Sequence, residues 1–529
     1  MRSVCSRARM KLISLVSQID ILMIPQETCY DELTLVKLYS VVAIFLIMLV
    51  IAPVAVQEPQ ATIQYQSSFT VADAGLLPAH NYVWQEINGF CAWAATTMAM
   101  EYAGVGLNMY DVFAASTIGF SFAYFRFDQT LLMFPGAIYS QAEPTDFLAK
   151  LYGVNYTIYL GDTIPNLEQN VQVWQSEGIN VGVLEGQSAA FDLMRRTIDA
   201  GYPLLISVDP AYLPSYDYDY LRAVGASGGA HGILIVGYND TETSATIIDP
   251  GVGSFGQYFG YPTDGRGNYT KITYTSLIDA WSRRYYISNT FFPDTQPSVS
   301  IDSRLGPMIR DKLLGVGTSY SPNSPNALVG KFGEAGFRKM SQDMTAEGLK
   351  SYLSVFDGVD NETSFKASLL YFIGVGLESQ VTLQYLSYRA ALKALPSIMS
   401  ETDLTDFIIA ADEALPSFDD LADNSSLIFP GNISESTGFV ATTFLEIAES
   451  FNVSGDIDAA LTPYVATLNA FSSDLLTIAN SWRDAGNALA AIWPNDFLTV
   501  YGPLLAFAGG GIAILIIGVL FYMKRKPSQ

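Results

Sequence analysis

One cysteine stands where its thiol could act as a nucleophile. Cys91 follows an Asn-Gly turn signal and precedes the apolar run Ala92–Tyr102, which Gly104 can end. The pattern predicts a helix that begins at Cys91, and a helix N-terminus lowers the pKa of a thiol towards the reactive thiolate. Gln85 lies six residues upstream, where its side-chain amide can donate a hydrogen bond beside the sulfur.

A thiolate nucleophile needs an imidazole partner and a third group that orients the imidazole. The chain has two histidines. His231 opens a buried-strand pattern, an Asn-Asp-Thr turn signal follows, and a returning strand ends at Asp249. A hairpin centred on Asp240 places Asp249 directly opposite His231. For His80, which stands in a Pro-containing loop before Cys91, we expect a structural role.

Each of these residues also has a purely structural interpretation. Free cysteine is among the most buried residue types, so Cys91 alone would be read as a core residue. His231 would be a core histidine at a strand edge, Asp249 a turn residue before a proline, and Gln85 an ordinary loop residue. Their joint occurrence favours a nucleophile with its base and orienting acid.

The order of these four residues resembles that of the papain-like cysteine peptidase superfamily, in the branch of bacteriocin-processing (double-glycine-leader) peptidases. The resemblance spans residues 61–292, and the pair Ala92-Trp93 departs from the Gly-Pro more often found in that branch. The motifs that carry it are Trp84-Gln85 to Cys91 before an Ala-rich helix, Ala230-His231-Gly232 running to Val236-Gly237-Tyr238, Ile248-Asp249-Pro250, and Leu277-Ile278-Asp279-Ala280-Trp281.

The resemblance implies acyl transfer from a peptide or protein substrate, without cofactor or metal. Cys91 would attack, His231 would protonate the leaving amine, Asp249 would fix the imidazole, and Gln85 would donate to the oxyanion. A cysteine acyltransferase or amidase could use the same residues, and a surface binding protein could keep the fold without turnover. The chain ends do not resemble the multi-span transporter of that branch, so export of a double-glycine leader is not expected.

Two long apolar segments flank this region. Residues 38–56 are typical of a signal peptide or signal anchor, and residues 502–523 are long enough to form a transmembrane helix. The basic run Lys524-Arg525-Lys526 predicts a cytoplasmic C-terminus and therefore an extracytoplasmic middle. Asn-x-Ser/Thr acceptors agree with an exported glycoprotein; they are Asn155, Asn239, Asn268, Asn361, Asn424, Asn432 and Asn452.

Composition limits the class of partner. The 529 residues carry a formal net charge of −24, which argues against a nucleic-acid partner. The three cysteines, of which only Cys91 lies between the apolar segments, exclude a disulfide framework. A Tyr-rich stretch, residues 212–220, lines a substrate cleft or is a surface loop, and the glycine-rich stretch 251–267 is interpreted as a plain connection.

The predicted fold class is α+β, with a papain-like peptidase domain, an α-helical domain and a C-terminal transmembrane helix. Helical patterning without Cys or His dominates after the peptidase domain, which indicates a structural or cleft-covering role. The predicted divisions are a tail (1–37), a signal peptide or anchor (38–56), the peptidase-like domain (62–298), a linker region (299–340), the helical domain (341–497), the transmembrane helix (502–523) and a cytoplasmic tail (524–529).

Overall fold

A computed structural model describes residues 74–86, 89–127, 130–135, 143–176, 178–223, 230–251, 261, 267–294, 300–316, 329–423 and 438–494. Among these residues, no helix is both long enough and apolar enough to cross a membrane. The two predicted membrane segments and both tails lie outside the described residues.

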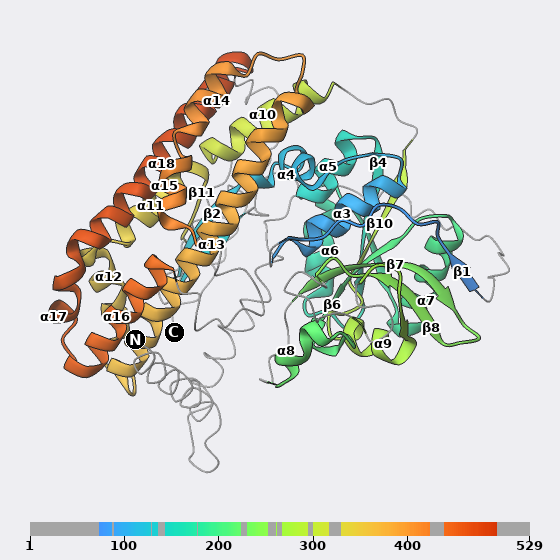
Figure 1. Ribbon diagram of the computed structural model, residues 1–529, viewed down its shortest axis with the longest axis horizontal. Helices are drawn as coiled ribbons and strands as arrows, with labels where there is room; N and C mark the ends of the chain where they lie inside the picture. Colours follow the sequence, from blue (N-terminus) through green and yellow to red (C-terminus); the bar gives the residue numbers. More distant parts are fainter. Residues whose placement is uncertain are drawn as a thin grey trace, which may run out of the picture.

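The first lobe is built on an eight-stranded sheet with the order β5-β4-β10-β6-β7-β8-β9, to which β1 adds by pairing with β7 (Figure 1). All pairings are antiparallel except that of β4 with β5. The strands are β1 (Ala74–Leu76), β4 (Val154–Gly161), β5 (Asn180–Leu184), β6 (Leu204–Val208), β7 (His231–Asn239), β8 (Ser244–Ile248), β9 (Thr270–Thr273) and β10 (Ser288–Pro293).

Strand β7 lies inside the sheet between β6 and β8, and it is buried from its first residue, His231, to Tyr238. A strand buried on both faces reads as a continuous apolar run, as this one does. Helices and short 3₁₀ turns surround the sheet: α3 (Cys91–Tyr102), α4 (Met109–Ala115), η1 (Ile118–Phe120), α5 (Pro144–Leu151), α6 (Leu167–Ser176), α7 (Gly186–Asp199), η2 (Pro210–Tyr212), η3 (Tyr216–Tyr218), α8 (Asp219–Ala223) and α9 (Tyr274–Ser282).

The second lobe is helical and is dominated by α13, a helix of 37 residues. Its aromatic core includes Phe418 and Trp482, both fully buried. The helices are α10 (Ile301–Leu314), α11 (Gly333–Asp343), α12 (Ala346–Leu353), α13 (Glu362–Ile398), α14 (Thr405–Asp412), α15 (Leu415–Leu421), α16 (Phe439–Ser454), α17 (Ile457–Leu461) and α18 (Val465–Ile492), with η4 (Ser354–Phe356) and η6 (Thr462–Tyr464) between them. A mixed α/β lobe followed by a helical region agrees with the predicted order of domains.

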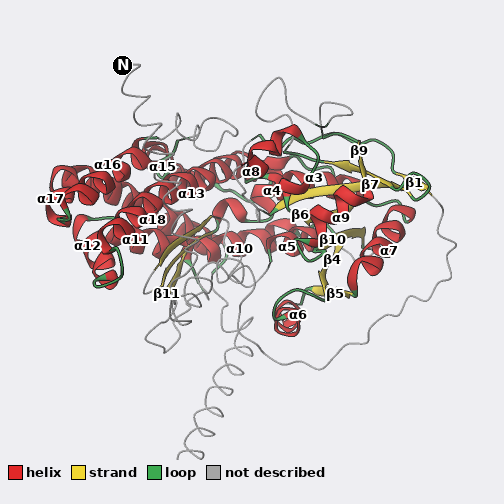
Figure 2. Cartoon of the chain, turned by 90° about the horizontal axis from the view of Figure 1, so that it is seen from below, coloured by secondary structure: helices red, strands yellow, loops and turns green. Residues whose placement is uncertain are grey.

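The two lobes are interlocked by a hairpin that the sequence did not reveal. Strands β2 (Phe122–Phe127) and β3 (Thr130–Pro135) leave the first lobe and form a separate sheet with β11 (Val329–Phe332), which Figure 2 shows beside the helical lobe. Phe122 stacks on Phe337 with ring centroids 3.9 Å apart. The Tyr124 hydroxyl donates to Asp343 at 3.0 Å.

The predicted domain boundaries therefore need correction. The predicted linker region, residues 299–340, contains α10, β11 and most of α11. Within this region, Arg310 and Asp311 are buried as an ion pair rather than exposed to solvent. The peptidase-like domain is likewise not self-contained, since its segment 122–135 completes a sheet of the second lobe.

Candidate active site

Cys91 is the first residue of α3, as the sequence predicted, and its thiol is free and buried. Residues 94–100 of this helix are buried and include three alanines, which lets α3 pack closely on β7. A Cβ atom at Gly232 would lie only 3.0 Å from the Cα of Ala92, so this approach requires a glycine in the strand. The close contact brings the start of α3 to the start of β7, where His231 lies.

His231 bridges the thiol and the acid. Its Nε2 lies 2.7 Å from Oδ1 of Asp249. An ionised carboxylate only accepts hydrogen bonds, so Nε2 carries the proton and donates it to Asp249. The side chain of His231 also shares a hydrogen bond with Cys91, and Nδ1 is the ring nitrogen left to make it. The structure thus brings Cys91, His231 and Asp249 together in that order.

The predicted hairpin register is wrong, although the contact it was meant to explain exists. In the structure Leu234 pairs with Ile248, so the position opposite Asp249 is Ile233 rather than His231. The turn contains Thr243 in the left-handed region, and a bulge lies between Ile235 and Gly237. Because the displacement is two residues, an even number, His231 and Asp249 still share one face of the hairpin.

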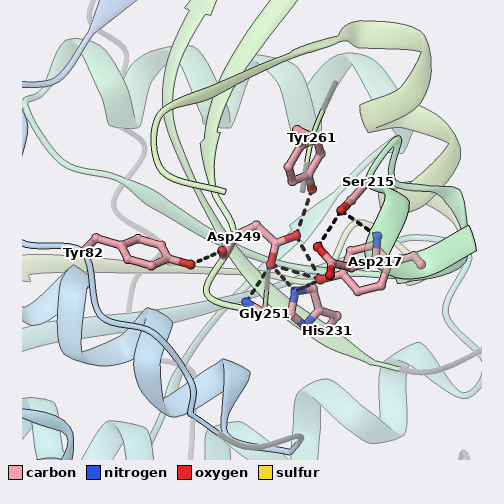
Figure 3. Close-up of polar contacts among 8 residues, drawn as sticks. Tyr82, Ser215, Asp217, His231, Asp249, Gly251 and Tyr261 are labelled. Carbon is pink, nitrogen blue, oxygen red and sulfur yellow. Dashed lines mark hydrogen bonds and ion pairs between the residues drawn. The ribbon is translucent and has the colours of Figure 1, made fainter. Parts of the chain in front are cut away.

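Asp249 is completely buried, and its carboxylate accepts hydrogen bonds from four groups (Figure 3). Besides His231 these are the Gly251 N–H at 2.9 Å from Oδ1, the Tyr261 hydroxyl at 2.8 Å from Oδ2, and the Tyr218 hydroxyl. Burial raises the pKa of the Asp249 carboxyl, but the His231 charge and these donors outweigh burial and hold it below its usual range. The carboxylate therefore stays ionised inside the protein.

The same balance acts on the other two groups. Burial raises the pKa of the Cys91 thiol, but the charge of His231, its hydrogen bond, and the N–H groups of Gly232 and Ala92 lower it overall. Burial lowers the pKa of His231, while Asp249 and Cys91 raise it to about 10. Each charged form thus stabilises the other, so the pairing favours a thiolate beside an imidazolium.

Gln85 lies beside the acid, because its backbone N–H donates to the carbonyl of Pro250 at 3.0 Å. Its side chain is buried, and among the described residues its Oε1 has no hydrogen-bond partner. Its role as an oxyanion donor stays a prediction. His80 lies at the other end of α3, where Nδ1 is 3.5 Å from Glu101 and the ring packs on Tyr102.

Two tyrosines of the site were missed by the sequence analysis. Tyr218 belongs to the Tyr-rich stretch, but it points inward and is buried, while Tyr216 of the same turn is exposed. The spacing of tyrosines was the available signal. Tyr261 and Gly251 lie in the glycine-rich stretch interpreted as a plain connection, and that interpretation is wrong at both residues because each binds Asp249.

Residues 77–278 match the model of the Peptidase_C39 like family. The matched range begins directly after β1, ends within α9 and includes Cys91, His231 and Asp249. The resemblance to the bacteriocin-processing branch of cysteine peptidases is thereby confirmed for this part of the chain, and the fold of the first lobe is of the cysteine peptidase type. No curated protein matches the chain. Within the described residues, no cluster of three or more His, Cys, Asp or Glu side chains is placed to hold a metal ion.

Proposed function

We propose that the chain is a cysteine peptidase that hydrolyses peptide bonds through Cys91, His231 and Asp249. The observation that carries the proposal is the continuous contact from Cys91 to His231 and from His231 Nε2 to Asp249 at 2.7 Å. An acid that holds one ring nitrogen leaves the other directed at the nucleophile. The family match of this region supports the same class of reaction.

The proposed reaction has two steps. The Cys91 thiolate bonds to the carbonyl carbon of the substrate, and the C–N bond breaks as His231 gives its Nδ1 proton to the leaving amine. A water then adds its oxygen to the thioester carbon and gives a proton to Nδ1, and the C–S bond breaks to restore the thiolate. Gln85 and the Cys91 N–H donate to the oxyanion, and one such donor is worth about 3 kcal/mol.

The proposal is tested by labelling Cys91 with iodoacetamide across pH in a purified fragment, residues 57–495. We expect labelling well below pH ~8.5, the ordinary thiol pKa, and its loss at neutral pH in His231→Ala. His80→Ala, which changes the only other histidine, serves as the matched control. Labelling that begins only near pH ~8.5 and is unchanged by His231→Ala would remove the enzyme proposal and leave a binding protein. A peptide and ester screen then separates a peptidase from an acyltransferase or amidase.

We also propose that this peptidase acts outside the cytoplasm while held to a membrane. The support is the apolar segments 38–56 and 502–523 and the basic residues that follow the second. A tag placed after Gln529 should be protected from protease added to intact cells, while the region around Cys91 is digested. Digestion of the tag together with that region would refute this orientation.

A further inference from the structure

The Tyr218 hydroxyl occupies a position between the imidazole and the acid that the proposed reaction does not use. Its oxygen lies 3.1 Å from His231 Nε2, 3.1 Å from Asp249 Oδ1 and 3.0 Å from Oδ2. The tyrosine and histidine rings meet edge to face with centroids 5.6 Å apart. Tyr218 ends η3, so it approaches the pair from outside the β7–β8 hairpin.

The hydroxyl acts on this pair as a hydrogen-bond donor. Burial and the charge of Asp249 raise the pKa of Tyr218 well above its usual range, so it remains protonated. Its single O–H therefore donates to the carboxylate, as does the O–H of Tyr261. A Cβ atom at residue 251 would lie 2.8 Å from the Tyr218 hydroxyl oxygen and 2.9 Å from Cε1 of His231, so the glycine allows this close assembly.

The titratable side chains around the pair come from several elements. They are Cys91 from α3, Asp217 and Tyr218 from η3, Tyr82 from the segment before α3, and Tyr261. Figure 3 shows Tyr82, Asp217 and Tyr261 around the pair. Tyr82 binds the backbone carbonyl of Asp249, and Asp217 binds Ser215, so neither donates to the carboxylate oxygens in the contacts described.

We propose that Tyr218 is a positioning residue that holds the His231 ring against Asp249 and shares the charge of that carboxylate. This proposal rests on the proposed Cys91–His231 pair. A carboxylate that gives part of its charge to a hydroxyl donor attracts the Nε2 proton less strongly. Tyr218 thereby limits how far Asp249 raises the proton affinity of His231, which must later release a proton to the leaving amine.

The test is Tyr218→Phe, which removes the hydroxyl and keeps the ring. The chain has two histidines, so the imidazole signals of His231 in a histidine-labelled protein are assigned by comparison with His80→Ala. The midpoint of the His231 titration should move upward by about 0.5–1 pH unit from its wild-type value. This NMR readout requires neither a substrate nor turnover, and a purely structural role would not move it.

The matched control is Tyr238→Phe. Tyr238 lies on β7, the strand of His231, and its hydroxyl donates to Asp199 at 2.8 Å, so the variant loses the same kind of bond elsewhere. Its His231 midpoint should be that of the wild type. If Tyr218→Phe fails to fold, Tyr261→Phe removes a donor from the same carboxylate and should move the midpoint in the same direction.

The possible outcomes separate this proposal from the one before it. In one outcome, the wild type shows the Cys91–His231 pair and His231→Ala disrupts it, but the His231 midpoint in Tyr218→Phe is unmoved or lowered. That result would overturn only the role of Tyr218. The same holds if Tyr261→Phe, used in its place, leaves the midpoint unmoved. A wild-type His231 with an ordinary midpoint, insensitive to loss of Cys91, would overturn both proposals.

Discussion

At the residue scale, the chemistry of the site depends on three buried groups, each of which shifts the pKa values of the others. Burial alone would leave the cysteine and the acid protonated and the histidine neutral. The structure opposes this with hydrogen bonds, because Asp249 has four donors and His231 lies between two anions. The imidazolium is thus stabilised by Asp249, and the thiolate is stabilised by the imidazolium. Removing the Asp249 carboxylate should therefore change the pKa of Cys91, since His231 contacts both groups.

The variant Asp249→Asn tests this coupling. The pKa of His231 should fall from about 10, because burial lowers this pKa and the charge of Asp249 is the largest effect that raises it. The pKa of Cys91 should rise, since it is lowered mainly by the His231 charge. The thiolate window, which lies above the Cys91 pKa and below that of His231, narrows from both sides. Cys91 labelling near pH 7 should drop about tenfold or more, given that one pKa unit is a factor of ten.

A matched control is Asp240→Asn in the turn of the same hairpin. Asp240 binds Arg195 at 2.9 Å and Tyr274 at 2.7 Å, so this variant also loses an ionised acid. It should leave Cys91 labelling at pH 7 within a factor of about two of the wild type, because its partners lie outside the site. Equal labelling in Asp249→Asn and the wild type would show that the acid does not act through His231.

At the element scale, the site depends on how closely α3 approaches β7. The sequence was sufficient to predict both elements and to place Cys91 and His231 at their starts, because helix and strand starts are marked by local turn signals. The register failed, since a bulge and the length of the turn are fixed by packing on neighbouring strands rather than by the turn residues alone. The position of Tyr218 was not predicted for a similar reason. The turn η3 directs its side chain inward, and a tyrosine-rich composition does not reveal that turn.

Gly232→Val tests the approach of the two elements. A Cβ atom there would lie 3.0 Å from the Cα and 3.3 Å from the N of Ala92, both backbone atoms of α3. The helix must move away, which should cost about 1–3 kcal/mol of unfolding free energy and weaken the Cys91–His231 contact. Chemical denaturation and the pH profile of Cys91 labelling measure the two effects.

Gly106→Val is the matched control, because a Cβ atom at residue 106 would meet no atom within 4 Å. It should change neither stability nor labelling appreciably. If Gly232→Val kept the wild-type labelling profile, the close packing of α3 on β7 would not be what sets the nucleophile beside its base.

At the scale of the whole molecule, the helical lobe is a structural partner of the first lobe. Phe120, Phe122 and Tyr124 come from the first lobe and are fully buried, with contacts to Tyr388, Phe337 and Asp343 of the second. Gln384 of α13 donates to the carbonyl of Gly119 at 2.7 Å. The pairing of β2 with β11 was not predictable from the sequence, because the two strands are about two hundred residues apart. The residue pattern of β2 does not indicate which strand it pairs with.

This second lobe also reaches the loop before Cys91. A Cβ atom at Gly89 would lie 3.0 Å from Cδ2 of Leu383, so α13 packs directly against the turn that leads into Cys91. A role as a stalk that only spaces the catalytic domain from a membrane does not require such a contact. The arrangement instead makes the helical lobe a support for the start of α3.

We therefore predict that the first lobe does not fold alone. A fragment of residues 57–298 should lack a cooperative thermal transition and bind an apolar dye, whereas residues 57–494 should melt cooperatively. In the short fragment, Phe120, Phe122 and Tyr124 lose the second lobe. Exposing half of their side-chain surface costs about 6–9 kcal/mol at ~25 cal/mol per Å². This cost is comparable with the whole stability of a domain. Supplying residues 300–494 as a separate chain should restore the transition and the low-pH labelling of Cys91. A cooperative, fully labelled short fragment would show that the second lobe stabilises neither the sheet nor the nucleophile.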